Sequence, residues 1–311
     1  MLRLSTALAL LLLSSARSQE LKRYEFESPR MGTLFRIILY APDAGSAEQA
    51  ADSAFSLAGE LNQSFSDYEA DSELMQLVGS RHATVSPELF QILEMAKEIA
   101  SETDGAFDIT TAAHTRNWRR ARITGALPSR EQIDAAKAAS GWKKLALEKD
   151  TRLVKLEAAG MRLDLGGIAK GYAADAMLRQ LRDGGFPIAS VAAGGDIAVG
   201  DPPPGRKGWK IAIEHGGARR ARTLTLSNRA LSTSGDDEQK VTIDGKSYSH
   251  IVDPRTGLGL TDSRPVSVLG DSATETDAFA TAFSILGEQK SAAIARRRGL
   301  ETIWASSQPE G

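Results

Sequence analysis

The stretch LDLGGIAKGYAAD, from Leu163 to Asp175, combines residue types that could bind an anionic ligand. An apolar run ends at Asp164, the pair Gly166 and Gly167 follows, and a helical pattern then begins around Lys170. Glycines let main-chain groups approach a ligand closely, and a helix N-terminus offers unpaired N–H groups to phosphate. The stretch matches neither G-x-x-x-x-G-K-[ST] nor G-x-G-x-x-G, so taken alone it is more typical of an ordinary turn before a helix.

The segment TETDAFATAF places a carboxylate and a hydroxyl on one face of a predicted helix, with Asp277 and Thr281 four residues apart. Hard oxygen ligands on a fixed face suit Mg²⁺, which usually keeps water molecules and takes phosphate oxygens to complete its octahedron. Backbone carbonyl groups freed by Gly166 and Gly167 could supply a further ligand. The alternative is that Asp277 only stabilises the helix dipole, as an acid near the helix N-terminus.

His250 lies in SHIVDPRTG, at the end of a predicted strand and just before a proline turn. Imidazole is the usual general acid or base near neutral pH, although a histidine in a turn often only bonds a backbone carbonyl group. The histidines His82, His114 and His215 lack comparable neighbours and are predicted to lie on the surface. The sequence contains no metal motif of the H-E-x-x-H or D-x-D-x-D-G type and no G-x-S-x-G serine motif.

The first 18 residues, MLRLSTALALLLLSSARS, have the pattern of a secretory signal peptide. Arg3 precedes the apolar run from Leu8 to Leu13, and Ala16 and Ser18 occupy the small-residue positions of a cleavage site. Because the run is too short for a membrane span, we expect cleavage after Ser18, with an uncleaved signal anchor as the alternative. The sequence has no cysteine to carry a lipid anchor, so we expect residues 19–311 to be free in the periplasm or otherwise exported.

Composition argues against a protein that binds nucleic acid or an anionic membrane, since the formal net charge is −2 at pH 7. The basic clusters Arg116 to Arg122 and Arg296 to Arg298 are predicted to be solvated faces. Without cysteine the chain has neither disulfides nor thiolate nucleophiles, so its core must stabilise it. Its length of 311 residues suffices for one large domain or two fused lobes.

The pattern of the chain predicts an α+β fold, in which helices surround a mixed, mainly antiparallel sheet. Within Tyr24 to Tyr40, the β-rich run TLFRIILY, with Met31 and Gly32 at its entrance, is predicted to be a first strand. Apolar spacing predicts a helix from Asp43 to Leu61. A serine cap and a proline predict a helix over Glu88 to Glu102. AFDIT is expected to be extended and to precede a polar insertion from His114 to Pro128. Further helices are predicted after Ser72 and Ser129, at Ala173 to Arg182 and at Ser272 to Leu286. Further strands are predicted in a hairpin at 145–156 and in the segments PIASVAAGGDIAVG, KIAIEH, RTLTLS, RALSTSG, KVTIDGKSYSHIV and RPVSVLG.

Taken in order along the chain, these motifs resemble one family, the bacterial FAD:protein FMN transferases, also called the ApbE family. The resemblance is carried by Met31-Gly32-Thr33, FSDYEADSEL, DGAFDIT, LDLGGIAKGYAAD, VAAGGD, ALSTSGD, SHIVDPRTG and SATETDAFATAFSILG. It covers nearly the whole chain after the signal peptide. It implies one ApbE-like (T-fold-like) domain over residues 19–311, built as a single unit or as two interlocked lobes.

The resemblance implies an activity: transfer of the FMN half of FAD to a threonine or serine hydroxyl of an acceptor redox protein, with magnesium, and with release of AMP. It implies magnesium ligands at Asp277 and Thr281, an oxygen ligand from the loop at Gly167, and a role in transfer for His250. It also implies a set of positions that contact FAD, namely Met31, Tyr68, Ala106, Phe107, Asp108, Asp164, Lys170, Gly194, Gly195 and Ile251.

This implied activity agrees with the chemistry of the residues, because cleavage of a pyrophosphate depends mainly on electrostatic stabilisation. Magnesium and Lys170 would neutralise the charge that builds on the bridging oxygen. Either His250 or Asp253 would take the proton from the acceptor hydroxyl, and the sequence leaves this choice open. Two other functions also stay open: hydrolysis of FAD to FMN and AMP, and flavin binding or storage without catalysis.

Two segments depart from the family pattern. Relatives often carry an aromatic residue where this chain has Asp237. After DGAFDIT the family commonly continues with Gly-Pro and a short apolar stretch, whereas here AAHTRNWRR is basic. This second change affects the entrance for the acceptor.

Overall fold

The structure, a computed structural model, describes residues 20–213, 222–234, 240–261 and 265–305. The predicted signal peptide, His215 and Asp237 lie outside these residues. Within the described ranges, the helices are all too short or too polar to cross a membrane.

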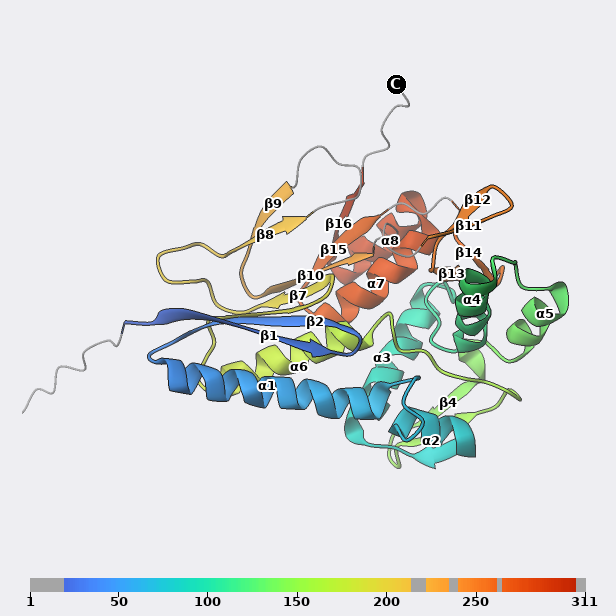
Figure 1. Ribbon diagram of the computed structural model, residues 1–311, viewed down its shortest axis with the longest axis horizontal. Coiled ribbons are helices and arrows are strands. Elements are labelled where there is room, and N and C mark those ends of the chain that lie inside the picture. The colour runs from blue at the N-terminus through green and yellow to red at the C-terminus, as the bar shows by residue number, and fades with distance from the viewer. Residues whose placement is uncertain (1–19, 214–221, 235–239, 262–264, 306–311) are drawn as a thin grey trace, which may run out of the picture.

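A seven-stranded sheet forms the centre of the molecule (Figure 1). Its strands follow the order β1, β2, β6, β7, β10, β15 and β16, and every neighbouring pair is antiparallel. In that order the strands span Lys22–Arg30, Thr33–Ala41, Ala189–Ala193, Asp196–Val199, Arg229–Ser234, Val266–Gly270 and Glu301–Trp304. The predicted α+β class with a mainly antiparallel sheet is therefore confirmed.

One face of the sheet is covered by three helices, α1 (Ala44–Phe65), α6 (Ala169–Asp183) and α7 (Ala273–Leu286). α6 contacts β6 and β7, α7 contacts β10 and β15, and the two helices contact each other. The main core fills this layer, and Phe35 and Phe279 are among its largest fully buried side chains. Each side chain of this size contributes about 1.5–3 kcal/mol on burial.

The opposite face of the sheet carries a hairpin of β8 (Trp209–Ile213) and β9 (Arg222–Leu226). This hairpin closes a smaller apolar cluster that includes Trp209 and Leu231. Figure 1 shows β8 and β9 on one side of β1 and β2, with α1 and α6 on the other.

A second group of elements lies at one end of the sheet (Figure 1). Its members are α2 (Glu73–Ser80), β3 (His82–Thr84), α3 (Pro87–Glu102), α4 (Ala112–Thr124), α5 (Arg130–Ala138), a 3₁₀ turn (Trp142–Lys144), β4 (Leu145–Glu148) and β5 (Leu153–Leu156). Strands β3, β5 and β4 form a small antiparallel sheet, which includes the predicted hairpin. The short hairpins β11–β12 (Val241–Ile243 and Lys246–Tyr248) and β13–β14 (Val252–Asp253 and Leu258–Gly259) pack around α4, and α8 (Glu288–Arg298) follows α7.

Helix starts that were predicted from capping residues are confirmed. Ser72, Ser86 and Ser129 each accept a backbone N–H from the residue three positions further on, at 3.1 to 3.3 Å. The first helix continues past its predicted end to Phe65, because Leu61 and Phe65 extend its buried face.

Two predictions about the elements are wrong, and one strand was not predicted. The predicted strand TLFRIILY is confirmed as β2, but β1 was not predicted, and Met31 and Gly32, with φ of 48° and 73°, form the turn that joins β1 to β2. The polar insertion after His114 is mostly the helix α4. AFDIT forms turns instead of an extended segment, since the Asp108 carboxylate accepts the N–H of Thr110 at 2.8 Å.

Candidate active site

A cavity of about 600 Å³ is lined by the glycine loop before α6, by α7, by α4 and by the segment before β13. It brings together most of the predicted site residues from distant parts of the chain. These are Tyr68, Ala106, Phe107, Asp108, Asp164, Gly167, Lys170, Gly195, His250, Ile251, Asp277 and Thr281. The structure does not place Met31, Gly194 or Asp253 in the cavity wall.

Lys170, Asp196 and Asp277 form a buried charged cluster in this wall, which we call the lysine corner. Lys170 Nζ lies 2.6 Å from Oδ2 of Asp196 and 3.3 Å from Oδ2 of Asp277. Burial and the Asp196 carboxylate raise the pKa of Asp277, although Lys170 opposes them. Burial alone would lower the pKa of Lys170, but the two carboxylates raise it above its usual value. Two acids share one ammonium group here, so the corner favours a further cation.

Close contact between α6 and α7 at Gly171 fixes the geometry of the corner. A Cβ atom at Gly171 would lie 2.1 Å from the carbonyl oxygen of Ala273 and 2.9 Å from the Cβ atom of Asp277, so a larger residue would separate the helices. The Gly171 N–H also donates to Asp277 Oδ2 at 3.1 Å. One turn further along α6, Asp175 accepts the N–H groups of Ala273 and Thr274 at 2.8 and 2.9 Å. α6 therefore holds the N-terminus of α7 in the position that directs Asp277 to the corner.

Asp277, Thr281 and Gly167 bring oxygen donors to one part of the wall. A Cβ atom at Gly167 would lie 3.1 Å from the Thr281 hydroxyl, so the loop and α7 meet there. The described part of the chain contains no group of three or more His, Cys, Asp or Glu side chains that could hold a metal ion. The side-chain donors here are instead the Asp277 carboxylate and the Thr281 hydroxyl, beside the acids of the lysine corner and the backbone of Gly167. Such a set fits a hard cation that keeps water and substrate oxygens in its shell, as Mg²⁺ does.

His250 and Asp253, the two predicted bases, have different surroundings. His250 lines the cavity together with Ile251. The Asp253 carboxylate is instead held by Arg255, whose Nε and Nη2 groups each donate to it at 2.8 Å. Partial burial raises the pKa of Asp253, but the hydrogen bonds from Arg255 outweigh it and lower the pKa below its usual value. Of the two residues, only His250 lines the cavity.

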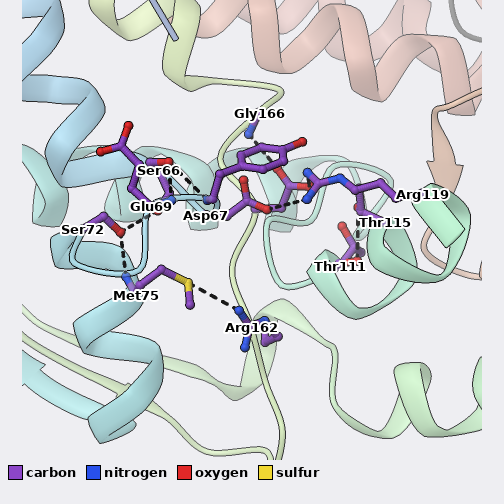
Figure 2. A network of polar contacts seen from close by, with 12 residues as sticks. Ser66, Asp67, Glu69, Ser72, Met75, Thr111, Thr115, Arg119, Arg162 and Gly166 are labelled. Atoms are coloured by element: carbon purple, nitrogen blue, oxygen red, sulfur yellow. Dashed lines mark hydrogen bonds and ion pairs between the residues drawn. The ribbon is translucent and has the colours of Figure 1, made fainter. Parts of the chain in front are cut away.

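Tyr68, Arg119, Asp67 and Asp164 form a second charged cluster, which we call the aromatic rim. The Arg119 guanidinium lies 4.3 Å from the ring centroid of Tyr68, and Tyr68 is 75% exposed. Arg119 Nη1 lies 3.0 Å from Asp67 and its Nη2 lies 3.7 Å from Asp164; Figure 2 shows the contact with Asp67. Burial and Asp164 raise the pKa of Asp67, with Arg119 opposing them. The prediction that Arg119 belongs to a solvated face is wrong, because this residue lines the cavity and its guanidinium pairs with Asp67.

The other arginine cluster also departs from its prediction. Arg298 is not simply solvated, because it pairs with Glu98, Glu102 and Glu275 and so ties α8 to α3 and α7. Its neighbours Arg296 and Arg297 are exposed, as predicted. Each arginine cluster therefore contains exposed arginines and an arginine that pairs with acidic side chains.

Ala106, Phe107 and Asp108 line the wall from the turn before α4. The Asp108 carboxylate accepts the N–H of Thr110 at 2.8 Å and that of Trp142 at 3.0 Å. Burial raises the pKa of Asp108 despite these bonds. Asp108 therefore holds the loop that presents Phe107 to the cavity.

Met31 and Gly194 lie in two turns at the end of neighbouring strands. Met31 lines a separate hollow with Thr33 and Asn62. Gly194 has a φ of 64°, and a Cβ atom there would lie 3.1 Å from the Thr33 hydroxyl. Gly194 makes the turn between β6 and β7 possible, and its neighbour Gly195 then reaches the cavity.

Two important cavity residues were not predicted as site residues. Asp196 directly follows Gly194 and Gly195 in VAAGGD, so its position after a glycine turn was a usable signal. The sequence signal for Arg119 as a site residue was weaker, because it consists only of the absence of acidic residues from the segment AAHTRNWRR. Thr233 and Ser234, at the end of β10, complete this side of the wall.

His114 was predicted to lie on the surface but is fully buried, whereas His82 is exposed as predicted. Neither ring nitrogen of His114 has a hydrogen-bond partner in the described structure. A Cβ atom at Gly257 would lie 2.9 Å from this imidazole, and Trp118 Nε1 donates to the Gly257 carbonyl oxygen at 3.2 Å. Burial, aided by Lys137, lowers the pKa of His114. His114 and Trp118 thus fasten α4 to the loop that follows His250.

The chain is similar to known proteins over most of its length. The chain is 29% identical over 299 residues to the FAD:protein FMN transferase of Salmonella typhimurium, covering 92% of this chain and 85% of that protein. It is 32% identical over 302 residues to the FAD:protein FMN transferase of Treponema pallidum, covering 90% and 83%. The crystal structure of the flavinyl transferase ApbE of Pseudomonas stutzeri in its apo form matches with a TM-score of 0.82 and 26% identity, covering 94% of this chain and 93% of that one. The flavin transferase ApbE of Vibrio cholerae matches with a TM-score of 0.82 and 26% identity, covering 92% and 94%. Residues 31–304 match the ApbE family, and the chain belongs to that family.

Proposed function

We propose that the protein is a magnesium-dependent FAD:protein FMN transferase that acts on a threonine or serine hydroxyl of an acceptor redox protein. In this reaction the hydroxyl oxygen attacks the phosphorus of the FMN half of FAD. The bond from that phosphorus to the bridging oxygen breaks, and AMP leaves. The hydroxyl proton passes to a base on the enzyme, and the acceptor carries FMN through a phosphoester.

The observation that carries the proposal is that the lysine corner, His250 and the aromatic rim surround one cavity of about 600 Å³. Cavities of this size hold ligands the size of common cofactors. The Lys170 ammonium group offsets negative charge on the pyrophosphate as the bridging oxygen departs. The exposed ring of Tyr68 offers a face on which an isoalloxazine ring can stack.

Two further assignments complete the site. Asp277, Thr281 and the Gly167 carbonyl would hold Mg²⁺, which supplies Lewis-acid stabilisation of a phosphoryl oxygen when it is bound. His250 takes the proton of the acceptor hydroxyl, because imidazole titrates near neutral pH and this residue lines the cavity. Asp253 is a poorer base, since Arg255 occupies both of its oxygens.

A second candidate function is hydrolysis of FAD to FMN and AMP, in which water replaces the acceptor hydroxyl. The exposure of Tyr68 at the rim favours it, because water can reach this side of the cavity. Flavin storage is a third function, and it would leave FAD intact.

The test is incubation of the purified protein with FAD, Mg²⁺, and the membrane and exported proteins of the source organism. We expect a band that fluoresces under ultraviolet light on a denaturing gel, and a mass gain equal to FMN on a threonine or serine of that protein. Omission of Mg²⁺ should abolish both signals. Free FMN without a labelled protein would support hydrolysis, and unreacted FAD would support storage.

The proposal places this reaction outside the cytoplasm, with the acceptor among membrane or exported redox proteins. Support comes from the sequence pattern of residues 1–18. The protein recovered from its native host should therefore begin at Gln19, as read by N-terminal sequencing. An intact chain that begins at Met1 would contradict cleavage after Ser18 and favour an uncleaved signal anchor.

A further inference from the structure

Positive charge is concentrated on α4 beside the cavity. Its sequence, AAHTRNWRRARIT, contains four arginines and no acidic residue, in a chain whose formal net charge is −2. Arg119 and Arg122 line the cavity, whereas Arg116 and Arg120 lie outside its wall. Arg116, Arg120 and Arg122 are exposed. Among the described residues, no ion pair involves the side chain of Arg116 or Arg120, so fold stability does not account for these two charges.

The spacing of residues divides α4 into distinct faces. His114, Trp118 and Ala121 form the buried face, which packs on the hairpins that follow β10. Arg116, Arg120 and Ile123 recur at intervals of four and three residues on the opposite side, and we call this surface the α4 face. Ile123 is 86% exposed, and Leu127 beyond the helix end is 38% exposed. An exposed apolar side chain between arginines is typical of a protein interface, where arginine and apolar anchors are enriched.

We propose that the α4 face is the docking surface for the acceptor protein, and that it binds an acceptor segment that carries carboxylate side chains and an apolar residue near the modified hydroxyl. The inference rests on the proposed transferase function and specifies the partner of that same site. The carboxylates pair with Arg116 and Arg120, and the apolar residue covers Ile123.

The position of the face supports an acceptor as its occupant. Arg119 and Arg122 connect the α4 face to the cavity along the flank of the same helix. An acceptor hydroxyl has to enter this cavity to react, so the segment that carries it must cross the cavity mouth. Trp118 fixes α4 to the Gly257 carbonyl oxygen at 3.2 Å, and this contact keeps the docking surface in register with the loop of His250.

An anionic membrane fits the face less well than an acceptor segment does. The exposed positive charge is confined to one helix of 13 residues, and the whole chain carries a formal net charge of −2. Membrane attraction falls off within a Debye length and requires several basic residues together, without opposing charge nearby. A short acidic peptide segment needs only the local pair of arginines.

The test uses the double variant Arg116→Glu with Arg120→Glu in the full chain, and the acceptor identified by its fluorescent band. Neither residue belongs to the cavity wall. We expect kcat/KM for the acceptor to fall by roughly tenfold or more and to lose most of its dependence on salt. The affinity for FAD, measured by flavin fluorescence, should stay at the wild-type value. The matched control is Arg296→Glu with Arg297→Glu, the same charge change on exposed residues of α8.

A charge exchange makes the test specific. Replacement of the acidic residues of the acceptor segment by lysine should slow the wild-type enzyme and restore much of the rate of the α4 double variant. The inference is overturned if the double variant matches its α8 control, or if the flavinylated segment carries no acidic residue. It is also overturned if the double variant keeps the wild-type kcat/KM for the acceptor and loses only its binding to vesicles of phosphatidylcholine and phosphatidylglycerol. If the wild-type enzyme labels no protein at all, the proposed function fails first, and the docking inference fails with it.

Discussion

The lysine corner and the aromatic rim contain the same kinds of groups, two acids beside one cation, in different surroundings. In the corner, Asp196 and Asp277 are 3% and 6% exposed and lie on β7 and α7, within the layers of the main sheet. In the rim, the side chains of Asp67 and Asp164 are 16% and 15% exposed and lie on loops. The two cations are similarly exposed, with 28% for the Lys170 side chain and 32% for that of Arg119, so the difference lies in the acids. Buried charges interact strongly, whereas solvent weakens those near the surface. Substitutions in the lysine corner should therefore stop the transfer reaction, whereas substitutions in the aromatic rim should change the affinity for FAD.

The largest effect is expected from Asp277→Asn in the corner. The substitution keeps the shape of the side chain but removes the negative charge, so transfer should slow by at least about 10²-fold. The protein should remain folded, because Lys170 keeps Asp196 as its partner at 2.6 Å. AMP release in a single turnover measures the rate, and calorimetry with Mg²⁺ measures metal binding. Asp271→Asn, a highly exposed aspartate just before the same helix, is the control and should behave as wild type. A full rate in Asp277→Asn would remove the corner from the mechanism.

The next effect separates the two candidate bases. His250→Ala should slow transfer by about 10²-fold with FAD binding nearly unchanged. Asp253→Asn should have a much smaller effect on the rate, because this carboxylate does not line the cavity and is held by Arg255. Stopped-flow single-turnover rates with the acceptor measure both variants. The reverse ranking would assign the proton transfer to Asp253.

A smaller effect is expected from Arg119→Ala in the rim. Loss of the guanidinium removes the contact with Tyr68 and leaves Asp67 and Asp164 without this counter-charge, so the affinity for FAD should fall by about five- to tenfold. The rate at saturating FAD should change little. Arg119→Lys keeps the charge without the planar fork, and its affinity should be intermediate. An equal loss of kcat in Arg119→Ala would show that the rim takes part in the chemical step.

The smallest effect concerns the pH dependence of stability through His114, which anchors the helix of the rim. The pKa of this buried imidazole is lowered from 6.5, so below that pH the unfolded chain binds a proton that the folded chain does not. Stability is therefore complete above pH 6.5 and decreases as the pH falls towards the folded pKa, with a slope of up to about 1.4 kcal/mol per pH unit. His114→Gln should flatten this slope in urea denaturation between about pH 7.5 and about pH 5.5. His82→Gln, at an exposed histidine, should keep the slope of wild type.

The helices and strands that were predicted correctly are those in which capping residues and apolar spacing agree with the residues that are buried in the structure. The helix at Ser86 and Pro87 has a cap, a proline at its first position and an apolar face, and all three appear in the structure. The corner was largely predictable as well, because Lys170 and Asp277 lie in segments where glycine, charge and helical spacing coincide. The turn after β1 was missed because Met31 occupies a position with positive φ, where asparagine or glycine is the usual signal.

In the rim, Tyr68 and Asp164 were predicted as site residues, but the part that α4 contributes, Arg119, was not. α4 has little apolar character, and its burial depends on Trp118 and His114 packing on hairpins more than a hundred residues away along the chain. A histidine and four arginines in a row of polar residues are typical of exposed chain, so local sequence favoured a solvated insertion. The contact of Arg119 with Tyr68 arises only from tertiary structure.

The close backbone contact between α6 and α7 at Gly171 links the charged site to the thermal unfolding of the protein. Because α6 and α7 touch there without an intervening side chain, the spacing of the charged groups on the two helices is a property of the whole helix layer. Heat or denaturant cannot loosen this spacing without opening the apolar interior. If the protein binds Mg²⁺ as proposed, its affinity for the metal should therefore be lost in the same cooperative transition as the tertiary structure.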